Sequence, residues 1–334
     1  MSEDRQTIRT LDIFCGAGGS STGAQMAGAT IVGGIDLWST AIETFKLNFP
    51  NAKTWKRRIE TLSGKEVKRQ IGKIDLLLAS PECTNHTFAK GNRREGEEQE
   101  KSRRTAFEVT RYAKALSPRW IVIENVVSMR RWELYAVWKK KLETLGYFVK
   151  EVVLDAKDFG VPQSRRRLYV VCDKLQDPTI PARSTAKPRN VRDILHSEES
   201  NGFNYAMSRL FWNRPKRAED TLDRARRAID SLGQNKPFLI VYYGTDAAGG
   251  WQTLDRPLRT VTTLDRFALV RPRANGHVMR MLQPPELAEA MGFPGDYKWP
   301  AVTRRERIKL AGNAVCPPVM KSVVAALVKS TSHF

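Results

Sequence analysis

Short runs of apolar, strand-forming residues recur through the first half of the chain, and amphipathic stretches with helical spacing separate them. The runs are nearly continuous in apolar residues, which is typical of strands buried on both faces of a sheet. Strands that alternate with helices predict an α/β fold with a mostly parallel, doubly wound, Rossmann-like sheet. The predicted strands cover 8–14, 30–36, 74–80, 119–126 and 167–173, and the predicted helices 20–26, 39–49, 106–116 and 132–145.

The pattern changes near Asp173, where prolines become frequent and the regular period is lost until about Gly250. Helical patterns return at 284–293 and in the apolar stretch 312–330. We therefore expect two domains. The larger domain covers 1–175 and is completed by 300–334, a smaller irregular domain covers 176–275, and a hinge with a connecting helix covers 276–299.

The charge balance of the chain favours a polyanionic partner. The 334 residues include 56 lysines and arginines against 36 aspartates and glutamates, a formal net charge of +20. Such an excess suits nucleic acid. A solubilising surface is the alternative, although solubility alone does not require an excess of one sign.

Cysteine and hydropathy patterns argue against several other classes of protein. The four cysteines are scattered and form no Cys-x-x-Cys pair, so we expect no disulfide framework and no metal site, in a reducing cytoplasm. A membrane span needs about 18 consecutive apolar residues, and we find no such run. The polar N-terminus does not resemble a signal peptide.

A glycine-rich turn, "CGAGG", follows the first predicted strand, and Asp36 ends the second. Glycines allow the backbone to approach a ligand closely, and the following helix contributes backbone amides. Asp36 could accept hydrogen bonds from ribose hydroxyls. A glycine-rich turn with a solvated loop acid is the alternative interpretation.

The third predicted strand runs into "SPECTNHT", which holds a single cysteine, Cys83. A lone cysteine is often a buried filler. Its position favours a nucleophile, because ligands bind beyond the carboxyl ends of strands in open α/β sheets. The neighbouring Glu82 is unexpected, since a carboxylate that interacts with the thiol would raise its pKa. We expect Glu82 to point away from the sulfur, toward a basic loop residue or a backbone amide.

Two further predicted strands carry charged residues at an end. Glu124 and Asn125 close the fourth run, where an acid must be solvated, paired or functional. The fifth strand opens with three arginines, of which Arg165 and Arg167 face one side and Arg166 the other. Paired guanidinium groups suit a phosphate or a carboxylate.

In order and spacing these motifs resemble those of the DNA (cytosine-5)-methyltransferases, and the resemblance covers nearly the whole chain. It includes the glycine-rich turn, the cysteine loop, "ENV" at Glu124, Gln-x-Arg-x-Arg at Gln163, "RPLRTVTT" and "GNAVCPPV". It implies a methyltransferase sheet that binds S-adenosyl-L-methionine and yields S-adenosyl-L-homocysteine. The implied cofactor-binding residues are Phe14, Gly16, Ala17, Gly18, Asp36, Leu37, Glu60, Pro81, Asn313 and Val315.

The resemblance also implies the chemistry. Cys83 would add to carbon 6 of a flipped-out cytosine, and Glu124 would bond ring nitrogen 3 and the exocyclic amine. Arg165 would lie near the base oxygen and phosphate, and Arg167 would organise the loop and Glu124. Carbon 5 would then accept the methyl group. The smaller domain would recognise the target, and the residues implied in DNA binding are Asn85, Lys90, Arg93, Arg94, Gln163 and Arg256.

The chain departs from the family pattern at two places. The family has proline before the cysteine and glutamine after it, where this chain has Glu82 and Thr84. An acid commonly contacts the adenine of the cofactor, whereas this chain has Arg58 near that point and Glu60 two residues on. The segment after Cys83 fits a loop that closes over DNA, with a solvated charged helix as the alternative.

The leading prediction is a DNA cytosine-5 methyltransferase, a monomer that acts on double-stranded DNA in the cytoplasm of a prokaryote or from a phage. A cognate restriction endonuclease is a candidate partner. Two alternatives stay open: a tRNA cytosine-5 methyltransferase of the same family, and a catalytically inactive DNA-binding relative. The four intact residues Cys83, Glu124, Arg165 and Arg167 argue against the inactive relative.

Overall fold

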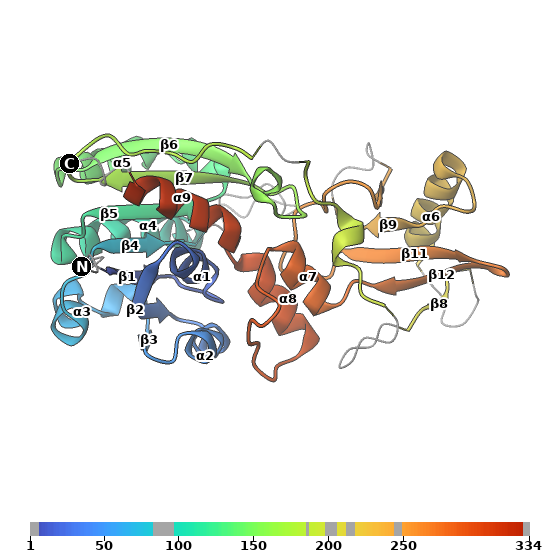
Figure 1. The fold of residues 1–334 in the computed structure, drawn as a ribbon, viewed down its shortest axis with the longest axis horizontal. Coiled ribbons are helices and arrows are strands. Elements are labelled where there is room, and N and C mark those ends of the chain that lie inside the picture. The colour runs from blue at the N-terminus through green and yellow to red at the C-terminus, as the bar shows by residue number, and fades with distance from the viewer. Residues whose placement is uncertain are drawn as a thin grey trace, which may run out of the picture.

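The structure is a computed structural model of the chain, with a larger and a smaller lobe (Figure 1). It describes residues 7–82, 97–184, 187–197, 206–211, 218–243 and 249–329, and the side chains of the helix that begins at Glu97 are described from Arg104 onward. The larger lobe is an α/β domain and the smaller lobe is built around a second sheet. The predicted fold class is therefore confirmed.

The larger domain contains a seven-stranded sheet in the order β3-β2-β1-β4-β5-β7-β6. Five neighbouring strands run parallel, and β7 is antiparallel to both β5 and β6. The strands are β1 (Ile8–Ile13), β2 (Ala29–Asp36), β3 (Lys53–Lys56), β4 (Leu76–Ala79), β5 (Trp120–Asn125), β6 (Phe148–Asp155) and β7 (Arg166–Asp173).

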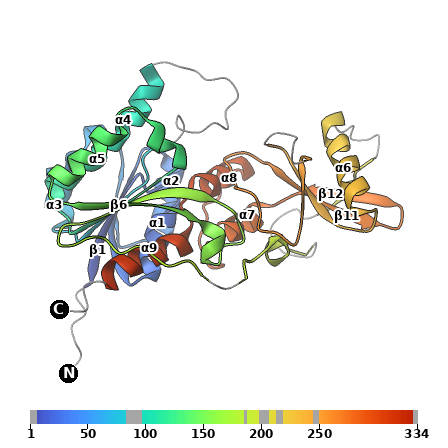
Figure 2. The same cartoon turned by 90° about the horizontal axis from the view of Figure 1, so that it is seen from above.

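Helices cover both faces of this sheet, which explains why its central strands are apolar throughout. In β4, Leu76 and Leu78 pack toward one core, whereas Leu77 and Ala79 pack toward the other. The first core lies under α1 (Gly19–Met26), α2 (Ser39–Asn48) and α9 (Pro317–Lys329). The second lies under α3 (Gly64–Ile71), α4 (Glu97–Leu116) and α5 (Tyr135–Thr144), on the opposite side of the sheet in Figure 2.

Several elements of this domain were not predicted, among them β3, β6 and α3. Strand β3 has only four residues, too few for a period. Strand β6 lies at the edge of the sheet and is only half-buried, so it lacks a continuous apolar run. Helix α3 is short and highly charged. The antiparallel direction of β7 relative to its neighbours was also not predictable, because a buried strand has the same apolar sequence pattern in either direction.

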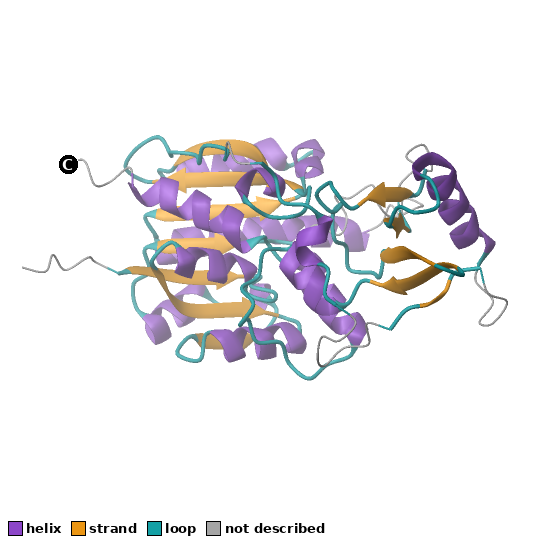
Figure 3. Cartoon of the chain, turned by 45° about the vertical axis from the view of Figure 1, so that its right-hand side comes forward, coloured by secondary structure: helices purple, strands orange, loops and turns teal. Residues whose placement is uncertain are grey.

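The smaller domain is more regular than expected. Its antiparallel sheet has the order β10-β9-β11-β12-β8, and α6 (Glu219–Leu232) packs on one face (Figure 3). Most of its strands are too short to give a sequence pattern. The expected boundary after residue 275 falls inside the β11–β12 hairpin and is wrong as a structural division. The strands are β8 (Ser208–Arg209), β9 (Phe238–Val241), β10 (Trp251–Thr253), β11 (Phe267–Arg273) and β12 (Gly276–Met281).

A buried ion pair joins the smaller domain to the helices that follow it. Arg280 of β12 donates two hydrogen bonds, of 2.8 and 2.6 Å, to the Glu286 carboxylate in α7 (Pro284–Ala290). Glu286 also accepts hydrogen bonds from the backbone amides of His196 and Gln283. The pair therefore fixes the segment after the short helix η4 (Val191–Ile194) against this junction.

The chain returns to the larger domain through α8 (Arg304–Asn313) and α9. The stretch Arg304–Lys329 is long and apolar enough to pass a test for a membrane span, but 61% of its most apolar window is buried. Helix α9 packs on α1, where Gly23 leaves no room for a side chain beside the Pro317 carbonyl. The stretch therefore consists of two helices, α8 and α9, and α9 packs in the core of the α/β domain.

Candidate cofactor and catalytic site

The glycine-rich turn between β1 and α1 has a backbone that most residues disfavour. Phe14, Gly16 and Gly18 have φ angles of 60°, 51° and 78°, in the left-handed region. A β-carbon placed on Gly16 would meet nothing within 4 Å among the described residues, so the turn is open on that side. An open backbone turn before a helix can accept a ligand at close range.

Asp36, at the end of β2, binds this turn directly. Its carboxylate accepts hydrogen bonds from the backbone amides of Gly16, at 2.9 Å, and Trp38, at 2.8 Å. Burial raises the pKa of Asp36, the two amides oppose that shift, and the nearby charge of Glu82 adds to it. Leu37 is 53% exposed beside it. The structure thus brings the predicted residues Gly16 and Asp36 together, with an exposed apolar side chain next to them.

The C-terminal segment supports the turn from behind. A β-carbon on Gly19 would lie 2.1 Å from the Val315 carbonyl oxygen, so only glycine permits this approach. The Tyr297 hydroxyl donates a hydrogen bond to the Ala17 carbonyl. Val315 is buried and Asn313 is exposed at the end of α8. Tyr297 was not predicted, although the aromatic cluster that it forms with Phe293 and Trp299 was a possible signal.

Asp12 lies beneath the turn and was also missed. Its side chain is fully buried and accepts a 2.7 Å hydrogen bond from the Ser21 hydroxyl. Burial raises the pKa of Asp12 to about 7, against the opposing effect of Ser21. An acid between two apolar strand residues, Leu11 and Ile13, was the available signal.

Glu60 lies in the short helix after β3 and is exposed. Its described partner is Arg58, with a nitrogen–oxygen distance of 4.0 Å. The structure does not bring Glu60 into contact with the glycine-rich turn through any described interaction. The adenine contact expected of Glu60 therefore stays a prediction.

The loop expected to be catalytic begins beside the end of β5. Pro81 is buried, and its carbonyl accepts a 3.1 Å hydrogen bond from the Asn125 side chain. Glu82 is exposed. Cys83 and the predicted DNA-binding residues Asn85, Lys90, Arg93 and Arg94 lie outside the described residues, as does the suggested closing loop up to residue 96.

Glu124 is 7% exposed at the end of β5, and Arg167 of the neighbouring β7 pairs with it. The distance from Arg167 Nε to Glu124 Oε1 is 3.2 Å. Burial raises the pKa of Glu124, whereas the charges of Arg167 and then Arg165 lower it. Because Asn125 contacts Pro81, this ion pair lies close to the point where the Cys83 loop leaves the described part of the chain.

Arg165 connects three distant segments. Its guanidinium donates hydrogen bonds of 2.9 Å to the Val261 and Gly312 carbonyls and of 3.1 Å to the Ala314 carbonyl. Its backbone amide donates to Asp155, which was not predicted. Arg165 is 4% exposed and anchors the two C-terminal motifs, and its expected place near the base oxygen and phosphate stays a prediction.

Gln163 is also turned inward, contrary to the expected contact with DNA. It is fully buried, donates a 2.9 Å hydrogen bond to the Ala290 carbonyl and accepts one of 2.8 Å from the Val261 amide. These contacts satisfy its polar atoms inside the protein, so the side chain does not reach the surface. Arg256, by contrast, is exposed, and its carbonyl accepts a hydrogen bond from the Val191 amide.

The known proteins whose sequences resemble this chain include Type II methyltransferases. The Type II methyltransferase M.HgiDI of Herpetosiphon aurantiacus is 27% identical over 318 residues, which cover 92% of this chain and 90% of the relative. M.Bsp6I of a Bacillus species, also a Type II methyltransferase, is 26% identical over 97% of this chain and 99% of its own length.

Two solved structures have the same fold. The S. pombe Dnmt2 methyltransferase has a TM-score of 0.68 and 19% identity, over 98% of this chain and all of that structure. The Entamoeba histolytica methyltransferase EhMeth gives the same score at 15% identity, over 98% of this chain and all of its own. The pattern of C-5 cytosine-specific DNA methylases matches residues 8–329, and the chain belongs to that family.

Proposed function

We propose that this protein transfers a methyl group from S-adenosyl-L-methionine to carbon 5 of cytosine in duplex DNA, through a covalent adduct of Cys83 with a flipped-out base. The observation that carries the proposal is the buried Glu124–Arg167 pair, which Asn125 links to Pro81, two residues before Cys83. A buried carboxyl whose pKa is shifted by burial and by neighbouring charges is suited to acid–base chemistry rather than to stability.

The glycine-rich turn fits the cofactor that the family uses. The open side of Gly16, the adjacent Asp36 carboxylate and the exposed Leu37 offer a backbone cradle, a hydrogen-bond acceptor and an apolar surface. Phe14, Ala17 and Gly18 would complete the cradle, and Val315 supports it. S-adenosyl-L-methionine supplies an electrophilic methyl group when it is bound there.

The chemistry follows from the side chains. The Cys83 thiolate would form a bond to carbon 6 of cytosine, and the ring electrons would shift toward carbon 5 and nitrogen 3. Glu124, whose pKa is raised by burial, can keep a proton to share with nitrogen 3 and so stabilise that charge. Methylation at carbon 5, loss of the carbon 5 proton to a base and departure of the thiolate would restore the aromatic ring.

Arg167 holds the Glu124 carboxylate in place, and we propose a positioning role for Arg165 because its guanidinium is occupied by three carbonyls. The net charge of +20 supports a DNA substrate. A cytosine within a stacked duplex is out of reach of a thiol, so the base must be flipped out, which costs a few kcal/mol. The smaller domain would recognise the target.

One experiment separates this proposal from its alternatives. The wild-type chain and Cys83→Ala are expressed in a host without cytosine methylation, and 5-methylcytosine is mapped in DNA and RNA by conversion sequencing. A mark in DNA that disappears with Cys83→Ala is expected. A mark in tRNA alone would support an RNA substrate, and none in either would support an inactive relative.

The Type II relatives also suggest a cognate restriction endonuclease as partner. We propose that a monomer of this chain protects prokaryotic or phage DNA against such an enzyme in the cytoplasm. Plasmid DNA from cells that express the wild-type chain should then resist cleavage by the endonuclease whose gene lies near the gene of this protein. Plasmid DNA from cells that express Cys83→Ala should be cleaved.

A further inference from the structure

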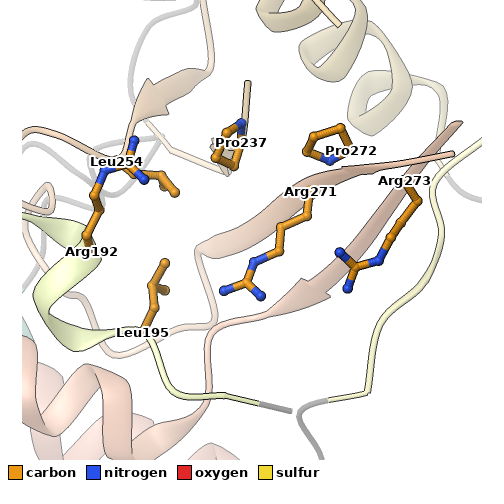
Figure 4. Close-up of a pocket in the computed structure, with 7 residues that line it drawn as sticks. All are labelled: Arg192, Leu195, Pro237, Leu254, Arg271, Pro272 and Arg273. Carbon is orange, nitrogen blue, oxygen red and sulfur yellow. The ribbon is translucent and has the colours of Figure 1, made fainter. Parts of the chain in front are cut away.

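The smaller domain contains a pocket of about 410 Å³ that the catalytic proposal does not use (Figure 4). Three arginines line it, Arg192 from η4 and Arg271 and Arg273 from β11, and two leucines and two prolines form the rest of its wall. We call it the arginine pocket. Its volume falls within the range of small-ligand sites.

The alternation of side chains along β11 explains why Arg271 and Arg273 lie on the same face of the strand. Phe267 and Leu269 point into the core shared with the larger domain, and Ala268 and Val270 point to the core under α6. Side chains two residues apart share a face, so Arg271 and Arg273 continue the first face beyond the end of its core. Figure 4 shows their guanidinium groups extending side by side in the same direction.

The β11 side of the arginine pocket lies away from the catalytic residues. Strand β9 leads from Pro237, in the wall of the pocket, toward Tyr243, whose hydroxyl donates to the Thr260 carbonyl next to the Arg165 contact at Val261. Strand β11 runs back in the opposite direction. Six residues of strand separate Phe267 from Arg273, roughly 20 Å. The β11–β12 turn lies at the end of the molecule farthest from the larger domain (Figure 1).

The chemistry of the wall favours a phosphate group. Guanidinium groups bind phosphate oxygens in pairs, and apolar walls suit the sugar or base attached to them. None of the described residues that line the pocket is acidic. Asp193, next to Arg192, accepts a hydrogen bond from the Asn190 amide and pairs with Arg189 at 3.9 Å, so it is engaged in the cap of η4.

The pocket is also held in shape before any ligand binds. The backbone amides of Val191 and Arg192 donate to the carbonyls of Arg256 and Leu254, which attaches η4 to the loop after β10. Ladder hydrogen bonds hold the other side, because Arg271 pairs with Val278 in the β11–β12 hairpin. A preformed site loses less entropy on binding than one that must be ordered.

We propose that the arginine pocket binds the phosphate group of a nucleotide unit, at a site separate from the catalytic centre. The phosphate has two possible sources. One is the backbone of bound DNA beyond the target cytosine, which rests on the proposed function, and the other is a free nucleotide.

The test compares wild-type protein with Arg271→Gln/Arg273→Gln, which removes two charges and keeps long polar side chains. Lys68→Gln/Arg69→Gln is the control, since it removes two charges from exposed positions on α3, in the larger domain. Thermal melting checks that all three proteins are folded. Binding of a duplex of about 30 base pairs is measured by fluorescence anisotropy over a salt series, and binding of deoxycytidine monophosphate and inorganic pyrophosphate by calorimetry.

If the phosphate comes from DNA, the slope of log K against log salt should become shallower by about 0.9 in the pocket variant, because the pocket neutralises one phosphate and each neutralised phosphate contributes about 0.9. The control should keep the wild-type slope. If the ligand is a free nucleotide, deoxycytidine monophosphate should bind wild-type protein, and the pocket variant should lose at least about tenfold in affinity, with the DNA slope unchanged.

The proposal is overturned if the pocket variant keeps the DNA slope and neither small phosphate binds wild-type protein, or if the control changes the slope as much as the pocket variant does. These binding measurements stay separate from methyl transfer. Absence of 5-methylcytosine with wild-type protein would contradict the proposed function alone, whereas unchanged binding by the pocket variant would contradict the arginine pocket alone.

Discussion

Glu124 and Arg167 meet across the neighbouring strands β5 and β7, with 3.2 Å between Oε1 of the acid and Nε of the arginine. The acid is buried, so its neutral form is favoured, while the adjacent guanidinium favours its charged form. Burial raises the pKa of this carboxyl and the guanidinium charge lowers it. A carboxyl subject to both effects can exchange a proton with a substrate more readily than one subject to either effect alone.

We predict that Arg167→Gln raises the pKa of Glu124 further, because it removes the main effect that lowers it. The acid then keeps its proton to higher pH, and the alkaline limb of the single-turnover rate profile moves upward in pH. The maximal rate should fall by about 10²-fold, as the carboxyl loses its orientation. A downward movement of the alkaline limb would contradict this assignment of Glu124.

Glu82 gives a second prediction about pH. Its charge contributes to the raised pKa of Asp36, the acid that binds the glycine-rich turn. We expect it to point away from the Cys83 sulfur, and Glu82→Pro should leave the apparent pKa of the thiol nearly unchanged in a pH–rate profile. A large downward shift of that pKa would show that Glu82 interacts with the thiol.

The open side of Gly16 can be tested against a matched glycine. Gly16→Ala and Gly146→Ala each place a β-carbon where φ is positive, 51° and 85°, with no described atom within 4 Å. Both should lose about 1 kcal/mol of unfolding free energy from backbone strain. Only Gly16→Ala should weaken binding of S-adenosyl-L-methionine, by at least about tenfold in calorimetry. Equal affinities in the two variants would argue against a cofactor at this turn.

Arg165 should matter mainly for stability. Arg165→Met keeps a long side chain but leaves the carbonyls of Val261, Gly312 and Ala314 without their donor. Three buried acceptors at about 1 kcal/mol or more each predict a loss of at least about 3 kcal/mol in urea unfolding. The exposed neighbour is the control, and Arg166→Met should change stability by less than about 0.5 kcal/mol.

Polar residues that interrupt or end an apolar run were recognisable from the sequence alone. Asp36 and Glu124 each end a buried strand, and both lie with the partners that such positions predict. The central strands were predictable for the same reason, since burial on both faces leaves a continuous apolar run.

Contacts between distant segments were not predictable in this way. Gln163 and Arg165 lie in a polar stretch that suggests an exposed site, yet Val261, almost a hundred residues later, contacts both side chains and helps to bury them. Tyr297 contacts Ala17 across a still longer separation. Local sequence determines which residues are polar, whereas tertiary packing determines whether they face solvent or the interior.

Asp12 leads to a prediction about stability and pH. Its carboxyl is fully buried, and its Oδ1 atom has no hydrogen-bond partner among the described residues. The pKa is about 7 in the folded protein against 3.8 for the free group, so folding favours the protonated acid. The stability that Asp12 contributes is therefore complete below about pH 4 and is lost as the pH rises through about 7.

From about pH 5 to about pH 8, the Asp12→Asn variant should gain roughly 3 kcal/mol of unfolding free energy relative to wild type in urea unfolding, since each pKa unit corresponds to about 1.4 kcal/mol. Asp177→Asn, at an exposed surface ion pair with Lys150, should follow the wild-type pH dependence within about 0.5 kcal/mol. A constant difference between Asp12→Asn and wild type across this range would mean that Asp12 is already ionised in the folded protein.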